Sequence, residues 1–375
     1  MGILQQIDKK QLSLLIIVFL IGSTPLFELG IEAKQDAWLA MLIAAGAGML
    51  LTVMYVKLQQ RAPNAGLADL LKYHFGRILG GSLATIYAIW FAYESMRNVR
   101  DVGELTTMAL LGLTPKWIIM FLILLLSAYT ISKGIEVFAR VVQLLFPLVV
   151  LSYSSIILLI FFSGLVKFNQ LLPILERGPM PVLKAVPDLV AFPFAQMVIM
   201  LVFMHLVKEK KSLERVTYRS QLSVSLFLVL MNALVLCVLG PQLAGVTSLP
   251  LLEVVQLVRL ANFLERLDII VTLLLFIGLY VKITTLYFAS VFTMIAVTGL
   301  SSRNLLFPIG IFIYATSFLE PNNTYHLWIG LEITLKIVPV FQIAFPLLML
   351  VVGIRKRYKP EAAGGGRRAE GVKEK

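Results

Sequence analysis

Cysteine, histidine and charged residues are scarce in this sequence of 375 residues. The one cysteine, Cys237, excludes a disulfide within the chain, and the three histidines lie far apart in the sequence. Charged residues make up 14% of the chain, whereas soluble domains average about 25%. No phosphate-binding glycine loop, HExxH motif, cysteine cluster or nucleophile elbow occurs. We therefore expect no enzyme, no cofactor, no metal site and no sizeable soluble domain.

Long apolar runs are abundant instead. Hydrophobic residues make up 59% of the chain and the mean hydropathy is +0.88. A helix needs about 20 mostly apolar residues to cross a bilayer, and runs of this kind recur along the chain. They predict an all-α integral membrane protein with about ten spans. The predicted spans are 12–31, 37–57, 80–98, 117–132, 141–164, 189–207, 222–240, 264–290, 305–318 and 327–352.

The basic residues indicate how these spans are oriented. When the spans alternate from a cytoplasmic N-terminus, most of the 33 Lys and Arg fall in cytoplasmic segments, as the positive-inside rule requires. Both termini are therefore predicted to be cytoplasmic. The net charge of +12 then reflects topology and contact with anionic lipid rather than a nucleic-acid surface.

The connections between the spans differ in character. Residues 66–77 and 249–263 carry apolar residues at helical spacing, which predicts two short helices along the membrane surfaces. Residues 167–188 are rich in proline and are expected to form a constrained outer loop. The transmembrane domain is expected over residues 1–360. The glycine-rich charged tail 361–375 is predicted to be disordered.

Two predicted spans are interrupted. The first contains IGSTPLFELG, with Gly22 and Pro25, and the sixth contains AFPFAQ, with Pro193. Proline removes a backbone hydrogen bond, and within lipid such a break is tolerated only beside protein or a watery cavity. The breaks fall in the first span of each set of five, which predicts inverted repeats at about 8–165 and 185–355. Matched breaks favour a midplane binding site, whereas simple proline kinks are the alternative.

The sequence resembles the B subunits of bacterial spore germinant receptors, the GerAB-type germination permeases of the amino acid–polyamine–organocation superfamily. The resemblance covers about residues 8–355. It is carried by KKQLSLLIIVFLIGSTPL, by LLPILERGPMPVLKAV leading into FPFAQ, and by ANFLERLDIIV leading to YVKITTLYFA. It implies a LeuT-like 5+5 inverted-repeat fold with ligand between spans one, three, six and eight. It also implies sensing of a small germinant, typically an amino acid, in the inner spore membrane with an A subunit and a lipoprotein C subunit.

Candidate ligand-binding residues lie at the two breaks and on span three. They are Gly22, Ser23, Thr24, Pro25, Tyr87, Phe192, Pro193, Phe194, Ala195 and Gln196. The exposed backbone at Gly22–Thr24 is expected to matter more than any side chain there.

Ionisable residues inside spans are functional candidates because burying charge in lipid is costly. Superfamily relatives hold a cation between spans one and eight, and we hypothesise that the Lys282 ammonium takes its place; snorkelling to an interface is the alternative. Glu94 and Glu28 are the further candidates for a cation or coupling site, and Glu28 is equally consistent with a surface position.

Charged residues near the ends of the spans have a more structural interpretation. Arg97, Arg100, Asp101 and Glu104 are expected to form an ion-pair network or a partner surface. The leading functional hypothesis is a receptor subunit with a transporter fold. The alternatives are a proton- or cation-coupled amino-acid transporter and a structural membrane partner with a degenerate pocket.

Overall fold

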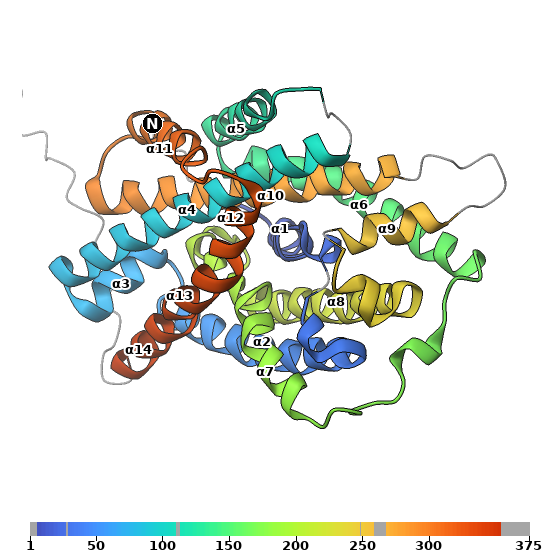
Figure 1. Ribbon diagram of the computed structural model, residues 1–375. Helices are drawn as coiled ribbons and strands as arrows, with labels where there is room; N and C mark the ends of the chain where they lie inside the picture. Colours follow the sequence, from blue (N-terminus) through green and yellow to red (C-terminus); the bar gives the residue numbers. More distant parts are fainter. Residues whose placement is uncertain (1–5, 28, 110–112, 248, 259–267, 354–375) are drawn as a thin grey trace, which may run out of the picture.

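The computed structural model describes residues 6–27, 29–109, 113–247, 249–258 and 268–353 (Figure 1). These residues are almost entirely helical. The α-helices are α1 (Lys9–Ile21), α2 (Ala37–Arg61), α3 (Leu67–Phe75), α4 (Arg77–Ala109), α5 (Lys116–Lys133), α6 (Ile135–Phe162), α7 (Met180–Ala191), α8 (Leu213–Ala244), α9 (Pro250–Leu257), α10 (Asp268–Thr298), α11 (Ser302–Thr316), α12 (Asn323–Trp328), α13 (Leu335–Pro339) and α14 (Phe345–Val352).

Shorter helical segments fill the gaps in the spans. The 3₁₀ segment η1 (Thr24–Leu26) follows α1, η2 (Ile31–Asp36) precedes α2, and η4 (Phe194–Val202) with η5 (Met204–Leu206) follows α7. Two π-helical segments, η8 (Ile329–Thr334) and η9 (Val340–Ala344), link α12, α13 and α14 into one rod. Bulges of this kind leave carbonyl groups free for other partners.

Seven stretches of the described chain are helices long and apolar enough to cross a membrane. They are Ile31–Arg61, Lys116–Lys133, Ile135–Phe162, Met180–Val202, Lys210–Ala244, Ile269–Thr298 and Asn323–Val352. The remaining predicted spans, the first, third and ninth, coincide with α1, α4 and α11. The chain is thus an all-α, multi-pass membrane protein, and ten spans remain the prediction.

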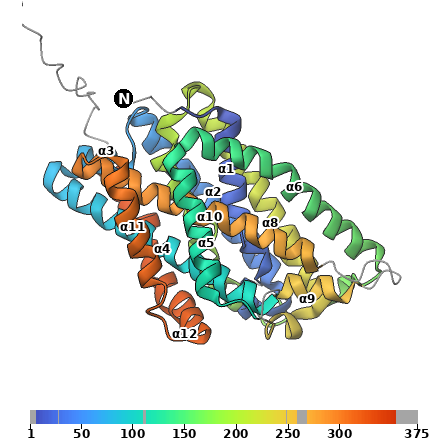
Figure 2. The same ribbon diagram turned by 90° about the horizontal axis from the view of Figure 1, so that it is seen from above.

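The buried centre consists of the segments that are apolar on every side. α1 is seen end-on in Figure 1, and it packs against α6, α8 and α10. All nine residues of η4 are buried. A helix that is apolar all round is expected to be buried, whereas the outer helix α6 and the rod α12–α14 are mostly exposed. α10 and α4 lie side by side along much of their lengths (Figure 2).

The proline-rich segment 167–188 was predicted to be a loop, and this is wrong for its second half. α7 begins at Met180 and contains Pro181 in its first turn and Pro187 further along. Proline is tolerated at a helix start because the first N–H groups have no partner within the helix. The sixth span therefore begins about nine residues before the predicted boundary of 189.

The two surface helices were predicted with different success. α3 (Leu67–Phe75) confirms the helix expected over 66–77. α9 (Pro250–Leu257) covers only the first half of the segment 249–263, and residues 259–263 lie outside the described residues. The tail 361–375 also lies outside them.

Candidate functional site

The first span is interrupted immediately after Ile21. Gly22 has φ +37°, which side chains other than glycine rarely adopt, and its N–H donates to the carbonyl of Val18 at 2.8 Å. The Thr24 hydroxyl donates to the carbonyl of Leu20 at 2.9 Å. Pro25 then lies in the short 3₁₀ segment η1. Backbone from Gly22 to Thr24 therefore leaves the helical path, and Ser23 and Thr24 are both buried there.

The second interruption follows Ala191. Phe192 is extended, with φ −136° and ψ 118°, and the peptide N–H of Gln196 donates to the carbonyl of Pro193 at 3.2 Å as η4 begins. Proline lacks an N–H and cannot continue the hydrogen-bond ladder of α7. The chain thus changes from an α-helix to an extended residue and then to a 3₁₀ segment within the sixth span.

Lys282 of α10 connects the two interruptions. Its side chain is 1% exposed. A Cβ added to Gly22 would lie 2.7 Å from the Lys282 Cε, so the lysine stem rests directly on the first interruption. The Lys282 ammonium lies 4.4 Å from the ring centroid of Phe192, at the second interruption. Within the described chain, this ammonium has no hydrogen-bond or ion-pair partner.

The electrostatics of this arrangement suit a cation. α1 and α7 both end where Lys282 lies, and a helix C-terminus carries roughly half a negative elementary charge. The aromatic face of Phe192 adds a cation–π contact. α10 also approaches the first interruption closely, since a Cβ on Gly278 would lie 2.4 Å from the Gly22 carbonyl oxygen. Glycine at 278 therefore permits the contact that places Lys282.

The other candidate residues divide between neighbouring helices. Phe194 packs on α2, where a Cβ on Gly48 would lie 2.5 Å from its own Cβ. The carbonyl of Ala195 accepts a hydrogen bond from Tyr55 at 3.3 Å. Gln196 is buried, and its Oε1 has no hydrogen-bond partner among the described residues. Phe194 and Ala195 at the start of η4 therefore contact α2.

The two candidates on α4 have different surroundings. The Tyr87 hydroxyl donates to the carbonyl of Phe341 in η9 at 2.5 Å, so it is engaged with the last span. Glu94 is buried, and its Oε1 is unpaired within the described chain. Glu94 forms no ion pair with Lys282 in the described chain. Glu28 lies outside the described residues.

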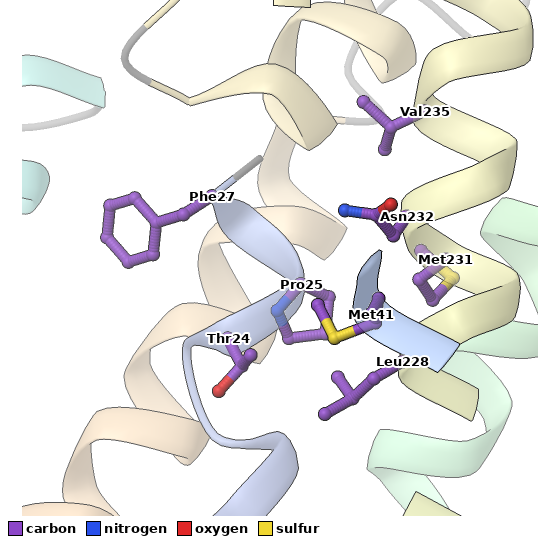
Figure 3. Close-up of a pocket in the computed structure, with 8 residues that line it drawn as sticks. All are labelled: Thr24, Pro25, Phe27, Met41, Leu228, Met231, Asn232 and Val235. Carbon is purple, nitrogen blue, oxygen red and sulfur yellow. The ribbon is translucent and has the colours of Figure 1, made fainter. Parts of the chain in front are cut away.

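Small pockets adjoin the first interruption. Thr24 and Pro25 line one pocket of about 230 Å³, which includes space open to the exterior. Figure 3 shows Pro25 facing Asn232 and its neighbours on α8, whereas the Thr24 hydroxyl points away from them. Gly22 lines a different pocket of about 180 Å³ with Tyr153 of α6 and Gly278. Both pockets have room for only about one water molecule, whereas ligand sites usually measure about 300–1,000 Å³, so the chain is closely packed around the first interruption.

Two polar residues near the interruptions were missed by sequence reasoning. The Tyr55 hydroxyl donates to the carbonyl of Gln342 in η9 at 2.7 Å as well as contacting Ala195. It thereby ties α2, η4 and the last span together. The amide group of Gln342 is fully buried and has no partner in the described chain. A glutamine inside an apolar span was a visible signal, whereas nothing in the sequence distinguished Tyr55.

The predicted charged network at the end of α4 is present, and it reaches further than expected. Arg97 pairs with Glu320 at 3.2 Å, and Arg100 pairs with Glu104 at 3.0 Å. Asp101 accepts a hydrogen bond from Nε2 of the fully buried His326 at 2.9 Å, and Nδ1 of His326 contacts Glu320. Because both ring nitrogens face carboxylates, the arrangement favours an imidazolium that donates from both nitrogens.

The opposite ends of the first and sixth spans are joined by backbone contacts. The Ile7 N–H donates to the carbonyl of Leu206, and the Lys208 N–H donates to the carbonyl of Ile7, each at 3.1 Å. Lys9 and Glu209 form an exposed ion pair at 2.6 Å, and this contact holds the pKa of Glu209 below its ordinary value. The two interrupted spans are thus fastened together on the side that the sequence predicts to be cytoplasmic.

The helical arrangement and the paired interruptions define a membrane protein with the LeuT-type transporter fold. The fold matches Mhp1, a nucleobase-cation-symport-1 family transporter solved with bromovinylhydantoin bound, with a TM-score of 0.68 and 10% identity, covering 92% of this chain and 78% of that one. It matches MhsT, solved in complex with L-phenylalanine, with a TM-score of 0.59 and 13% identity, covering 93% and 89%.

Sequence comparison then gives the family. The family model described as "Spore germination protein" matches residues 6–325, and the chain belongs to that family. Spore germination protein KB of Bacillus subtilis (strain 168) is 30% identical over 96% of this chain and 98% of its own length. Spore germination protein YndE of the same organism is 23% identical over 85% of this chain and 87% of its own length.

Proposed function

We propose that this protein is the B subunit of a spore germinant receptor in the inner spore membrane. It binds a small germinant, such as an amino acid, at the midplane between the two interruptions, and it signals to an A subunit and a lipoprotein C subunit. The ligand acts by differential affinity for two arrangements of the helices. Membership of the spore germination family supports the receptor role.

The position of Lys282 is the observation that supports the proposed binding site. One buried ammonium is held against the first interruption by its stem and against the second by its head. A fixed positive charge at this point takes the place of a bound cation, so germinant binding needs no coupling ion. Because Lys282 belongs to α10, a shift of α10 would move this charge relative to both interruptions.

Replacement of Lys282 tests this proposal. Spores that carry Lys282→Met are expected to lose most of their germinant response, because the two helix C-termini then face each other without a cation. The matched control is Lys336→Met, which removes an exposed lysine paired with Glu332 at 2.8 Å. The measurements are germination rate against germinant concentration and recovery of the assembled receptor. An unchanged response together with unchanged assembly would refute the role of Lys282.

A cation-coupled amino-acid transporter is the second candidate function. The likeness to solved transporters favours it. Uptake of radiolabelled amino acids into proteoliposomes separates the two functions, because a receptor does not concentrate its ligand. Concentrative uptake would exclude a pure receptor. Thermal shifts of the purified protein with amino acids, sugars and nucleosides would identify the class of ligand.

A further inference from the structure

One face of α8 carries a line of buried polar side chains. They are Thr217, Gln221, Ser225 and Asn232, which follow one another at helical spacing. All four are at most 6% exposed. α8 packs against α1 and α2 along this length. We call these four residues the α8 polar stripe.

Most polar atoms of the stripe have no hydrogen-bond partner in the described protein. The unpaired atoms are Thr217 Oγ1, Gln221 Oε1 and Nε2, Ser225 Oγ and Asn232 Oδ1. The exception is Nδ2 of Asn232, which donates to the carbonyl of Leu29 at 3.0 Å. Buried polar groups in proteins are almost always paired, with protein or with ordered water. The four stripe residues therefore depart from this rule together, along one face of α8.

A neighbouring serine on the same helix shows the usual pattern. The Ser220 hydroxyl contacts both the Val216 carbonyl at 2.9 Å and the Ser13 hydroxyl at 2.7 Å. A hydroxyl on α8 can therefore find protein partners, either within the helix or across to α1. The lack of hydrogen-bond partners is therefore specific to the stripe, and it is not shared by every polar side chain of α8.

One end of the stripe lies at a pocket, and the other end lies close to the exposed start of α8. Asn232 and Thr24 line the pocket at the first interruption, which has room for about one water molecule (Figure 3). At the other end, Thr217 lies one turn from the start of α8, beside the exposed contact between Glu214 and Gln60. The stripe spans about 22 Å at the rise of an α-helix. The stripe therefore runs from the fully buried Thr217, one turn into α8, to the pocket beside the first interruption.

We propose that the α8 polar stripe binds a file of water molecules between α8 and the helices α1 and α2. The stripe offers hydroxyl and amide groups, which both donate and accept hydrogen bonds, and it carries no charge. This chemistry suits water rather than a metal ion or a charged solute. The water connects the end of α8 at Leu213 with the first interruption, and it satisfies the buried groups there. The proposal does not depend on which ligand the protein binds.

Hydroxyl-radical labelling of single cysteines tests the water file. The full chain carries only Cys237, so a Cys237→Ala background makes each new cysteine unique. Ser225→Cys probes the stripe, and Leu234→Cys is the control because Leu234 is buried and lies on the opposite side of α8 from the stripe. Radicals generated from bound water by X-rays react within their immediate surroundings. Oxidation of the new thiol is expected to be several-fold faster in the Ser225→Cys variant than in the Leu234→Cys variant.

A second pair keeps the test decisive if either variant fails to fold. Asn232→Cys, in the Cys237→Ala background, is compared with the native Cys237 of the unsubstituted protein, which is buried and lies on the other side of α8. Thermal unfolding first establishes that each variant is folded. Faster oxidation at the stripe position in a folded pair supports the proposal. Equal rates within a folded pair, whether slow or fast, overturn it.

Discussion

Gly22 and Lys282 occupy complementary positions at the level of single residues. Glycine leaves the space that the lysine stem fills, and its positive φ lets α1 end there. The lysine in turn supplies the positive charge beside two helix C-termini. A buried lysine is costly without such compensation, and these neighbours of Lys282 supply it.

Substitution of Gly22 tests this fit. Gly22→Ala is expected to destabilise the protein by about 1–3 kcal/mol, because alanine is strained at positive φ and its methyl group meets Lys282. Gly46→Ala is the control, since nothing lies within 4 Å of an added Cβ at this position in α2, and it should stabilise by roughly 0.5–1 kcal/mol. Thermal unfolding in detergent measures both. Equal melting temperatures for the two variants would contradict the predicted clash.

Elements far apart in the sequence are held together by the charged network at the end of α4. Glu320 lies between α11 and α12, and it meets Arg97 of α4 and His326 of α12. The network therefore fixes the start of the last span against the third. The π-helical segment η9 of the same rod accepts hydrogen bonds from Tyr55 and Tyr87. The last span is thus attached to the core at several levels.

Removal of a network carboxylate should be far more damaging than removal of a surface one. Glu320→Gln is expected to cost about 3–5 kcal/mol, because Arg97 and His326 would remain buried with too little negative charge. Glu136→Gln breaks the exposed pair with Arg140 and should cost roughly 0.3–0.5 kcal/mol. Unfolding by denaturant in detergent gives both values. Similar small losses for the two variants would show that the network does not stabilise this end of the fold.

The whole molecule combines a transporter-type fold with membership of the spore germination family. The charge distribution predicts which face of this fold is cytoplasmic, and the interruptions lie between the two faces. The contacts of Ile7 with Leu206 and Lys208 close one of these faces. We expect this face to be the cytoplasmic one, since the basic segments adjoin it.

Cysteine labelling in intact membranes tests the orientation. In the Cys237→Ala background, Asn169→Cys places a thiol on the predicted outer side, and Lys211→Cys places one on the predicted cytoplasmic side; both positions are exposed. An impermeant maleimide added from outside should label the Asn169→Cys variant directly and the Lys211→Cys variant only after permeabilisation. The reverse pattern would invert the topology and move the Ile7 contacts to the outer face.

The sequence by itself determined the membrane class, the fold and the positions at which the first and sixth spans are interrupted. Apolar run length, proline and glycine act locally, so their effects can be predicted from local sequence. The network residues Arg97, Arg100, Asp101 and Glu104 were also predictable, since they cluster on one helix. Their partners Glu320 and His326 were not, because they lie more than 200 residues away.

Only the tertiary structure decided which candidate residues share a site. Lys282 joins Gly22 and Phe192 because α10 packs directly on the first interruption, whereas Phe194 and Ala195 face α2. It also decided that the polar residues of α8 form one largely unpaired line. Such relations depend on the packing of helices that are distant in the chain, and packing is set by side-chain shapes across the whole core rather than by local sequence.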